Sequence, residues 1–210
     1  MKLMKDKSVD LILTDPPYGV NYEGGATNDV KREKLVGDET ADLYQKLYPE
    51  IHRILKDDGT AYIFFASGYE KLVFPIPDIF EKYEVLIWFK TNASFGAANA
   101  RYHQDYEPFL YLRKNGGSKW RGTTKERMVW FEKRNAINTH HPTQKPIDIV
   151  SRMIQNSTDK NDIVFDPFLG SGTTAVACKQ LKRDFIGIEI SEHYCQIAQQ
   201  RLDSLTQNLF

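Results

Sequence analysis

The sequence predicts an open α/β fold, in which a mostly parallel β-sheet carries helices on both faces. Two observations predict it. Short apolar runs typical of buried strands alternate along the chain with segments of helical periodicity. Two motifs rich in proline or glycine directly follow such strands, and open α/β sheets bind their ligands outside the carboxyl ends of strands. The length of 210 residues favours one domain, residues 1–210, that contains an insertion.

Six segments have the pattern of strands, because each holds a short run of apolar or β-branched residues. They are Val9–Thr14, Ala61–Phe65, Val85–Phe89, Pro108–Leu112, Asp162–Phe165 and Asp184–Ile190.

Four segments have apolar residues at helical spacing. The apolar positions of the first are Leu43, Leu47, Ile51, Ile54 and Leu55, and those of the second are Ile147, Val150 and Ile154. The third segment is Thr173–Leu181, and the fourth has Tyr194, Ile197, Ala198 and Leu202. Ser191 is expected to cap this last helix, because a serine hydroxyl can accept a backbone N–H of the first turn.

Composition excludes several classes of protein. The 28 Lys and Arg residues balance 28 Asp and Glu residues, which excludes a polybasic binder but not an enzyme with a local basic face. The two cysteines form no Cys-x-x-Cys pair, so neither a zinc finger nor a disulfide scaffold is expected. No apolar stretch approaches the roughly 20 residues of a membrane helix, and no signal peptide is recognised. We therefore expect a cytoplasmic protein with no membrane segment.

The first motif is Asp15-Pro16-Pro17-Tyr18, directly after the strand Val9–Thr14. Each proline holds the preceding residue extended, which presents the Pro16 carbonyl to a site instead of pairing it in a sheet. An exocyclic amine of adenine or cytosine is a poor nucleophile, because its lone pair is delocalised into the ring. Asp15 and the Pro16 carbonyl can accept both amine hydrogens and aim the lone pair at an electrophile, while Tyr18 stacks on the base. The alternative is a structural proline turn with the Tyr18 ring in the core.

The second motif runs from Asp166 to Thr174, between a strand and a helix. Gly170 and Gly172 let a ligand approach the backbone at a helix N-terminus. No lysine follows Gly172, so a triphosphate-binding P-loop is disfavoured. Glu189 follows about 20 residues later, where an acidic residue commonly binds the ribose of a nucleotide-like cofactor. The alternative is a tight turn with a solvated glutamate.

Two segments interrupt the alternation of strands and helices. Tyr22–Glu39 is polar and contains glycines, which is typical of a loop that could close over a site. Arg113–Asn138 holds eight basic and two acidic residues, a net charge of 8 − 2 = +6, with aromatic residues between them. The second segment is the expected insertion.

Taken in this order, the two motifs resemble those of the S-adenosylmethionine-dependent amino-methyltransferases of DNA, in their circularly permuted β group. There the Asp-Pro-Pro-Tyr motif comes first and the Phe-x-Gly-x-Gly loop last, as here with Phe168, Gly170 and Gly172. Tyr102–Pro108 and His141–Pro146 are similar to two further stretches of the family. The resemblance covers nearly the whole chain. It implies a Rossmann-like methyltransferase sheet with a permuted motif order.

The resemblance implies a role for each matching residue. The catalytic pocket would consist of Asp15, Pro16, Pro17 and Tyr18. S-adenosylmethionine would be bound by Asp166, Pro167, Phe168, Gly170, Ser171, Gly172, Thr173 and Glu189, with Thr143, Gln144 and Lys145 near its carboxylate. Aspartate as the first letter of the motif points to adenine, so the implied reaction is methyl transfer to N6 of a flipped adenine in duplex DNA. No metal is implied, and the adjacent His140 and His141 are poorly placed to share one.

The basic segment lies where the family places target recognition. Because arginine and lysine can meet phosphates and read guanine edges, we expect DNA contacts there. The expected residues are Arg113, Lys114, Lys119, Arg121, Lys125 and Arg127. The alternative is a solvated basic loop whose tryptophans complete the core.

One feature departs from the family, which usually has a strand and a Gly-Asp pair before the first motif. Only Met1–Ser8 precede the first strand here, so either an edge element is missing or the start is truncated. Three competing functions stay open: methylation of cytosine N4 in DNA, methylation of an RNA base, and DNA binding without catalysis. A homodimer and a restriction-enzyme partner are also left open.

Overall fold

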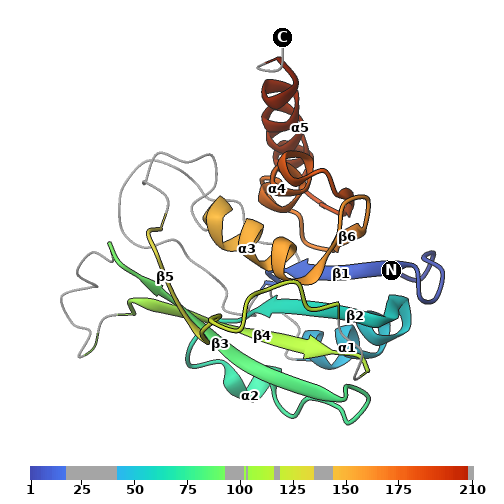
Figure 1. The fold of residues 1–210 in the computed structure, drawn as a ribbon, viewed down its shortest axis with the longest axis vertical. Coiled ribbons are helices and arrows are strands. Elements are labelled where there is room, and N and C mark those ends of the chain that lie inside the picture. Colours follow the sequence, from blue (N-terminus) through green and yellow to red (C-terminus); the bar gives the residue numbers. More distant parts are fainter. Residues whose placement is uncertain (18–41, 93–101, 103, 116–118, 135–143, 208–210) are drawn as a thin grey trace.

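A computed structural model describes the chain except for residues 18–41, 93–101, 103, 116–118, 135–143 and 208–210. The described strands form one sheet in the order β5-β3-β4-β2-β1-β6-β7 (Figure 1). Their bounds are Val9–Thr14 for β1, Leu55–Phe64 for β2, Lys82–Lys90 for β3, Tyr106–Arg113 for β4, Val129–Glu132 for β5, Ile163–Asp166 for β6 and Asp184–Gly187 for β7.

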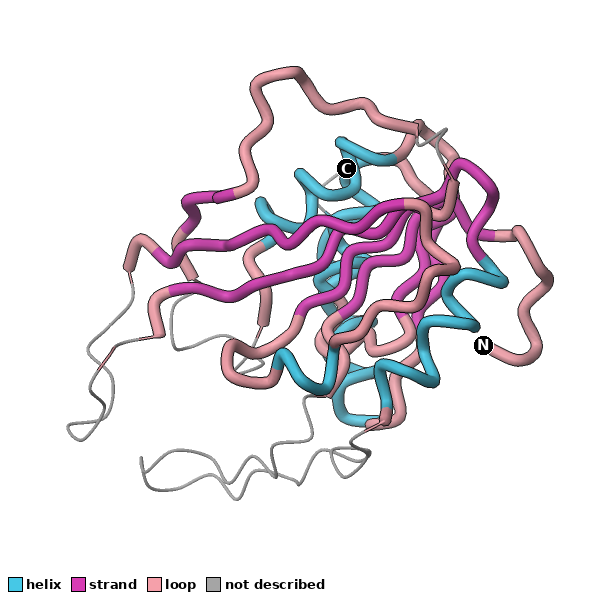
Figure 2. Tube along the Cα trace, turned by 90° about the horizontal axis from the view of Figure 1, so that it is seen from below, coloured by secondary structure: helices cyan, strands magenta, loops and turns pink. Residues whose placement is uncertain are grey.

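The sheet is mostly parallel, as predicted. β1 runs parallel to β2 and β6, β6 to β7, and β3 to β5, while β4 runs antiparallel to β2 and β3. The strands lie side by side with a marked twist (Figure 2). We call the end where the parallel strands finish and β4 begins the carboxyl edge, and the opposite end the amino edge. Both sequence motifs follow parallel strands, so the topology brings them to the carboxyl edge.

Helices cover both faces of the sheet (Figure 1). The helices α1 (Leu43–Ile54) and α2 (Glu70–Val73) lie on one face, and α3 (Ile147–Ser157) and α4 (Thr173–Leu181) lie on the other. The last helix, α5 (Glu192–Gln207), packs against α4 and projects away from the sheet. Two clusters of buried apolar side chains, one on each face, form the core.

Several predicted elements agree closely with the structure, and others need correction. The bounds of β1 and α4 are those predicted, and the amide of Tyr194 donates to Oγ of Ser191, 3.5 Å away, at the start of α5. Leu55 is wrongly assigned to the first helix: it is the first residue of β2 and pairs with Val9. The prediction follows helical spacing, but pairing with β1 decides the conformation. β7 ends at Gly187 rather than Ile190, because the chain leaves the ladder with β6 there.

The basic segment contains a strand that the sequence analysis did not predict. β5 pairs with β3 and is an outermost strand of the sheet, and Trp130 in its centre is 2% exposed. The Trp130 ring packs 5.2 Å from that of Phe109, and the Arg152 guanidinium lies 4.2 Å from its centroid. Trp130 thus completes the core, whereas Trp120 is 41% exposed. Part of the expected insertion is therefore built into the fold.

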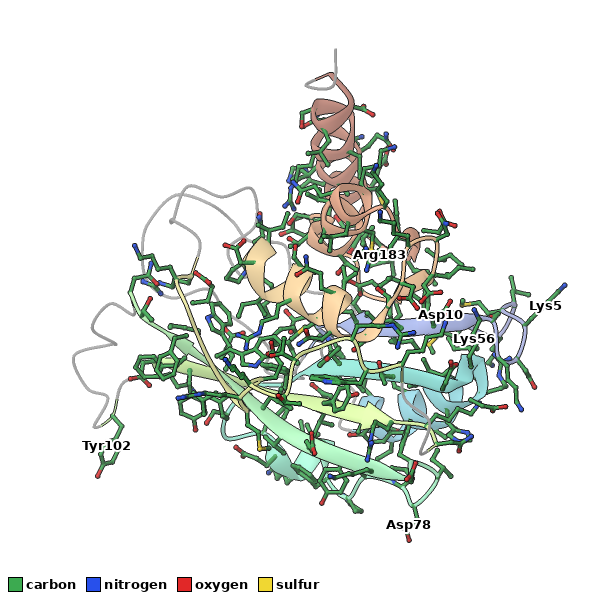
Figure 3. All side chains as sticks on the ribbon, in the orientation of Figure 1. Lys5, Asp10, Lys56, Asp78, Tyr102 and Arg183 are labelled. Atoms are coloured by element: carbon green, nitrogen blue, oxygen red, sulfur yellow. The ribbon has the colours of Figure 1, made fainter. Side chains whose placement is uncertain are left out.

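Asp10 connects β1 to three other segments at the amino edge through its carboxylate. Its side chain is 1% exposed, and its carboxylate accepts Nζ of Lys56 at 2.7 and 2.8 Å and Nζ of Lys119 at 2.9 Å. It also accepts the backbone amide of Ile163, the first residue of β6. Burial by itself raises the pKa of Asp10, but these donors outweigh it and hold the pKa below its usual value. Figure 3 shows Asp10 and Lys56 together at this end of the sheet.

Replacing Asp10 by alanine is expected to destabilise the fold by about 3 kcal/mol, because it leaves a lysine and a buried amide without their shared acceptor. Urea unfolding followed by circular dichroism measures this change. The control is Asp78→Ala, since Asp78 is exposed and points away from the fold (Figure 3), and no measurable loss is expected there. Equal stability of the two variants would contradict the role assigned to Asp10.

Candidate active site

The first motif lies at the carboxyl edge. Asp15 follows β1 directly and is partly exposed, while Pro16 is buried and Pro17 half-buried. Tyr18 lies outside the described residues, as does the loop Tyr22–Glu39. Of the predicted catalytic pocket, the structure thus places the carboxylate and the two prolines next to each other at the end of a central strand.

The ammonium group of Lys145 lies between two carboxylates. Its Nζ atom is 2.5 Å from Oδ2 of Asp15 and 3.1 Å from Oε2 of Glu107, and it lies 4.8 Å from the centroid of the Phe64 ring. Burial by itself lowers the pKa of Lys145, but the two carboxylates outweigh it and raise the pKa above the ordinary value for lysine. Lys145 is therefore positively charged at neutral pH, and its ammonium group faces the carboxylate of Asp15.

Glu107 forms a second ion pair, with Lys90, through its other carboxylate oxygen. Nζ of Lys90, the last residue of β3, is 2.8 Å from Oε1 of Glu107 in β4. Burial raises the pKa of Glu107, but Lys145 and Lys90 outweigh it and lower the pKa. We call Lys90, Glu107, Lys145 and Asp15 the charge row, because positive and negative groups alternate along it. The row joins three separate segments of the carboxyl edge to the first motif.

The glycine loop between β6 and α4 lies at the same edge. Gly172 has φ 83° and caps α4, and a Cβ atom there would lie 2.7 Å from Cβ of Ala198 in α5. Both the left-handed backbone and the close approach of α5 therefore require glycine. Gly170 has φ 53°, and a Cβ atom there would meet nothing within 4 Å. The loop thus has open space beside its backbone, which is where a ligand of this loop would bind.

Asp166 begins this loop as a buried carboxyl group. Its Oδ1 atom accepts the amide of Phe168 at 3.0 Å, and Oδ2 accepts the hydroxyl of Thr174 at 2.7 Å. Burial raises the pKa of Asp166 to about 7, although these two hydrogen bonds oppose the shift. A cation bound beside Asp166 would favour its ionised form.

Glu189 reaches the glycine loop from the end of β7. Its Oε2 atom accepts the amide of Gly170 at 2.7 Å, and Oε1 accepts the amide of Ser191 at 2.9 Å. The spacing in the sequence predicted that Glu189 would bind the ribose of a cofactor, which stays a prediction, and the structure places this acid against the glycine loop. Glu189 is tied to the backbone and not simply a solvated side chain.

The remaining predicted cofactor residues gather around the same loop. Pro167 is buried, Phe168 packs against the core, and Thr173 is the first residue of α4. The hydroxyl of Ser171 lies 3.5 Å from Oε1 of Gln144, which links the loop to the segment before α3. Thr143 lies outside the described residues.

Three residues of this region were not predicted: Arg201, Glu107 and Lys90. Arg201 in α5 donates from Nη1 to the Ser171 carbonyl at 2.6 Å and to the hydroxyl of Thr173 at 3.3 Å. One feature of the sequence could have pointed to Glu107, because it lies in the family-like stretch Tyr102–Pro108. No feature of the sequence pointed to Lys90 or Arg201.

The structure does not bring four of the six predicted DNA-binding residues to this site. Arg113 ends β4 at the amino edge, and Lys114 is 5% exposed, with Nζ donating to the carbonyl of Leu55. Lys119 pairs with Asp10 and Asp162, and Arg121 makes two hydrogen bonds to Asp159. All four lie at the amino edge, opposite Asp15, and ion pairs there compensate the charges of Lys114, Lys119 and Arg121. Lys125 and Arg127 are exposed, between that edge and β5.

The described residues fit S-adenosylmethionine as the bound group. Its cationic end matches the buried carboxyl of Asp166, and its ribose hydroxyls match an acid such as Glu189. Open space at Gly170 leaves room for it between the two. In the described part of the chain, no three histidine, cysteine, aspartate or glutamate side chains gather as a metal site would need. No described helix is long and apolar enough to cross a bilayer.

Comparison with known sequences identifies relatives that match nearly all of this chain. The family model described as DNA methylase, for N6 and N4 methyltransferases, matches residues 9–200. The type II methyltransferase M.HpaI of Haemophilus parainfluenzae is 31% identical over 97% of this chain and 71% of its own length. The putative methylase YubD of Escherichia coli is 32% identical over 96% of this chain and 85% of its own length. The DNA adenine methyltransferase YhdJ of the same organism is 29% identical, over 97% and 79%.

Solved structures agree in fold. The complex of M1.HpyAVI with SAM has a TM-score of 0.71 and 26% identity, and covers 96% of this chain and 90% of that one. The PvuII cytosine-N4-specific DNA methyltransferase has a TM-score of 0.73 at 18% identity, over 95% and 81%, and so shares the fold. With the site described above, these matches show that the chain belongs to the DNA methylase family of N6 and N4 amino-methyltransferases, with S-adenosylmethionine as its methyl donor.

Proposed function

We propose that this protein methylates the exocyclic N6 nitrogen of adenine in duplex DNA, acting on a base flipped out of the helix. One observation carries the proposal. The carboxylate of Asp15, held by the ammonium group of Lys145, lies at the same sheet edge as a glycine loop with room for the cofactor. One domain, residues 1–210, would thus supply both the amine acceptor and the methyl-donor site. As part of this proposal, the enzyme acts in the cytoplasm, together with its DNA.

In this mechanism the protein orients the amine. Asp15 accepts one hydrogen of the target amine and the carbonyl of Pro16 accepts the other, so that the nitrogen lone pair points toward the methyl donor. S-adenosylmethionine, when bound, supplies a methyl group on a sulfonium that is already a strong electrophile. Lys145 holds the carboxylate of Asp15, and Glu107 pairs with Lys145, so that the orientation of Asp15 toward the amine is fixed before the base arrives.

Two observations support adenine over the competing substrates. Aspartate stands first in the Asp-Pro-Pro-Tyr motif, and one relative that matches 97% of this chain is named as a DNA adenine methyltransferase. The cytosine-N4-specific neighbour shares the fold at 18% identity and supports no substrate for this chain. A DNA-binding remnant without catalysis is disfavoured by two contacts: the ion pair of Asp15 with Lys145, and the contact of the neighbouring Gln144 with Ser171 in the glycine loop. The homodimer and the restriction-enzyme partner stay predictions.

The duplex would approach from the carboxyl edge, because a flipped base has to reach Asp15 there. Lys133 and Arg134 directly follow β5 at this edge, and their backbone is fixed by two hydrogen bonds between Asn92 and Arg134. Phe131 is 63% exposed beside them, and Tyr102 is 91% exposed at the same end of the molecule (Figure 3). We therefore propose that this part of the basic segment, rather than Lys119 and Arg121, contacts DNA.

Replacing Asp15 by alanine is expected to lower the rate of methyl transfer at least about 100-fold, because the amine loses a fixed acceptor. Binding of S-adenosylmethionine, measured by calorimetry, is expected to stay close to that of the native protein, since Asp15 faces the base. A tritium-transfer assay on unmethylated duplex DNA measures the rate. Methylation by the variant at the native rate would overturn the proposed mechanism.

The double variant Lys133→Ala/Arg134→Ala is expected to weaken duplex binding and to reduce the slope of log K against log salt by about 2, one unit for each lost phosphate contact. Fluorescence anisotropy over a series of salt concentrations measures both. Arg121→Ala is the matched control, because its ion pair with Asp159 lies at the amino edge, and its slope should equal that of the native protein. A reduced slope in the control alone would place the DNA at the amino edge instead.

A further inference from the structure

We propose that Glu107 is a positioning residue for methyl transfer: it holds the ammonium group of Lys145 in the place where that group fixes the carboxylate of Asp15. This inference rests on the proposed function, because it takes Asp15 as the acceptor of the target amine. In this arrangement Glu107 acts through Lys145 and is itself held by Lys90.

The charge row connects residues that are far apart in the sequence. Lys90 ends β3, Glu107 lies near the start of β4, Lys145 precedes α3, and Asp15 follows β1. The antiparallel direction of β4 brings its beginning to the carboxyl edge, where β3 ends. Successive distances between the charged atoms are 2.8 Å, 3.1 Å and 2.5 Å. The topology thus delivers a second carboxylate, that of Glu107, to the ammonium group of Lys145.

Lys145 needs two partners to stay in its place. Its side chain is 9% exposed and has four rotatable bonds, so its buried ammonium group is costly unless carboxylates compensate it. The Phe64 ring contributes one favourable contact, and Asp15 and Glu107 contribute the opposite charges. Without Glu107, the ammonium group would lose one of its two carboxylates and would be held less firmly in its place. A less fixed ammonium group would orient Asp15 less well for the target amine.

The surroundings of Asp15 make this arrangement sensitive to charge. Lys145 is its cationic neighbour, and Glu107 contacts Lys145 through one oxygen and Lys90 through the other. The carboxyl of Asp166 and the hydroxyl of Tyr44 also interact electrostatically with Asp15, the latter while donating to the carbonyl of Phe64 at 3.1 Å. Removing Lys145 therefore takes a cation from beside Asp15, and the carboxylate loses a group that fixes its orientation.

The test is the single-turnover rate of methyl transfer with saturating cofactor and duplex DNA, so that chemistry rather than product release is measured. Three variants are compared with the native protein: Glu107→Gln, Lys145→Gln and the double variant. Glu107→Gln is expected to lower the rate about 10-fold while the KM for duplex DNA stays close to the native value, because positioning acts on the chemical step. Lys145→Gln is expected to lower the rate at least as much. The double variant is expected to be no slower than Lys145→Gln, because Glu107 acts through Lys145.

Glu84→Gln is the matched control. Glu84 makes a comparable ion pair with Lys82 at 3.1 Å, but on the exposed part of β3 and away from Asp15. Its rate and its KM for duplex DNA are expected to equal those of the native protein. Thermal unfolding and cofactor titration of each variant separate a loss of fold or cofactor affinity from a loss of positioning, since rates are compared only at full cofactor occupancy.

The outcomes separate this inference from the proposed function. If Glu107→Gln keeps the native rate, or if the double variant is about 10-fold slower than Lys145→Gln, Glu107 does not position Lys145 and the inference is wrong. The proposed function survives that result as long as Asp15→Asn is inactive. If Asp15→Asn transfers methyl groups at the native rate, the role of Asp15 fails, and the inference fails with it.

Discussion

The parallel direction of β1 and β6 is the constraint on which the site depends. These neighbouring strands end at the same edge, so Asp15 and the loop that begins at Asp166 meet there although they come from opposite ends of the chain. The motif order along the chain has no influence on this meeting, which explains how a permuted order supports the same chemistry. Central strands also fix Asp15 and Asp166 more rigidly than loops would. A transfer between two bound groups needs this rigidity, because small errors in orientation cost large factors in rate.

Local sequence predicts much of this arrangement and fails where distant segments compete. β1 and α4 are predicted with their bounds, because buried apolar periodicity and a glycine at the helix start act locally. Leu55 fits the face of α1 by spacing, and only its pairing with Val9 assigns it to β2. β5 has four residues, and its burial depends on β3 and on Arg152 above Trp130. Neither partner is visible in a short window of sequence.

The charges of the chain divide into two sets that the sequence does not distinguish. Lys119 and Arg121 lie in a segment with net charge +6, yet carboxylates from other segments compensate them at the amino edge. Lys145 carries a similar charge but pairs with the carboxylates of Asp15 and Glu107 at the carboxyl edge. The difference lies in the partners, which only the fold brings near. Counting charges along the chain therefore overestimates the basic surface available to DNA and overlooks the row that supports Asp15.

Identification of the methylated base tests the central claim most directly. The protein is incubated with S-adenosylmethionine and unmethylated duplex DNA, and the DNA is digested to nucleosides and analysed by mass spectrometry. The account predicts N6-methyladenine, which establishes the base, the atom and the reaction together. N4-methylcytosine would keep the fold and cofactor but contradict the assignment of adenine. DNA without any methylated base, with the cofactor bound and the duplex bound, would contradict the account as a whole.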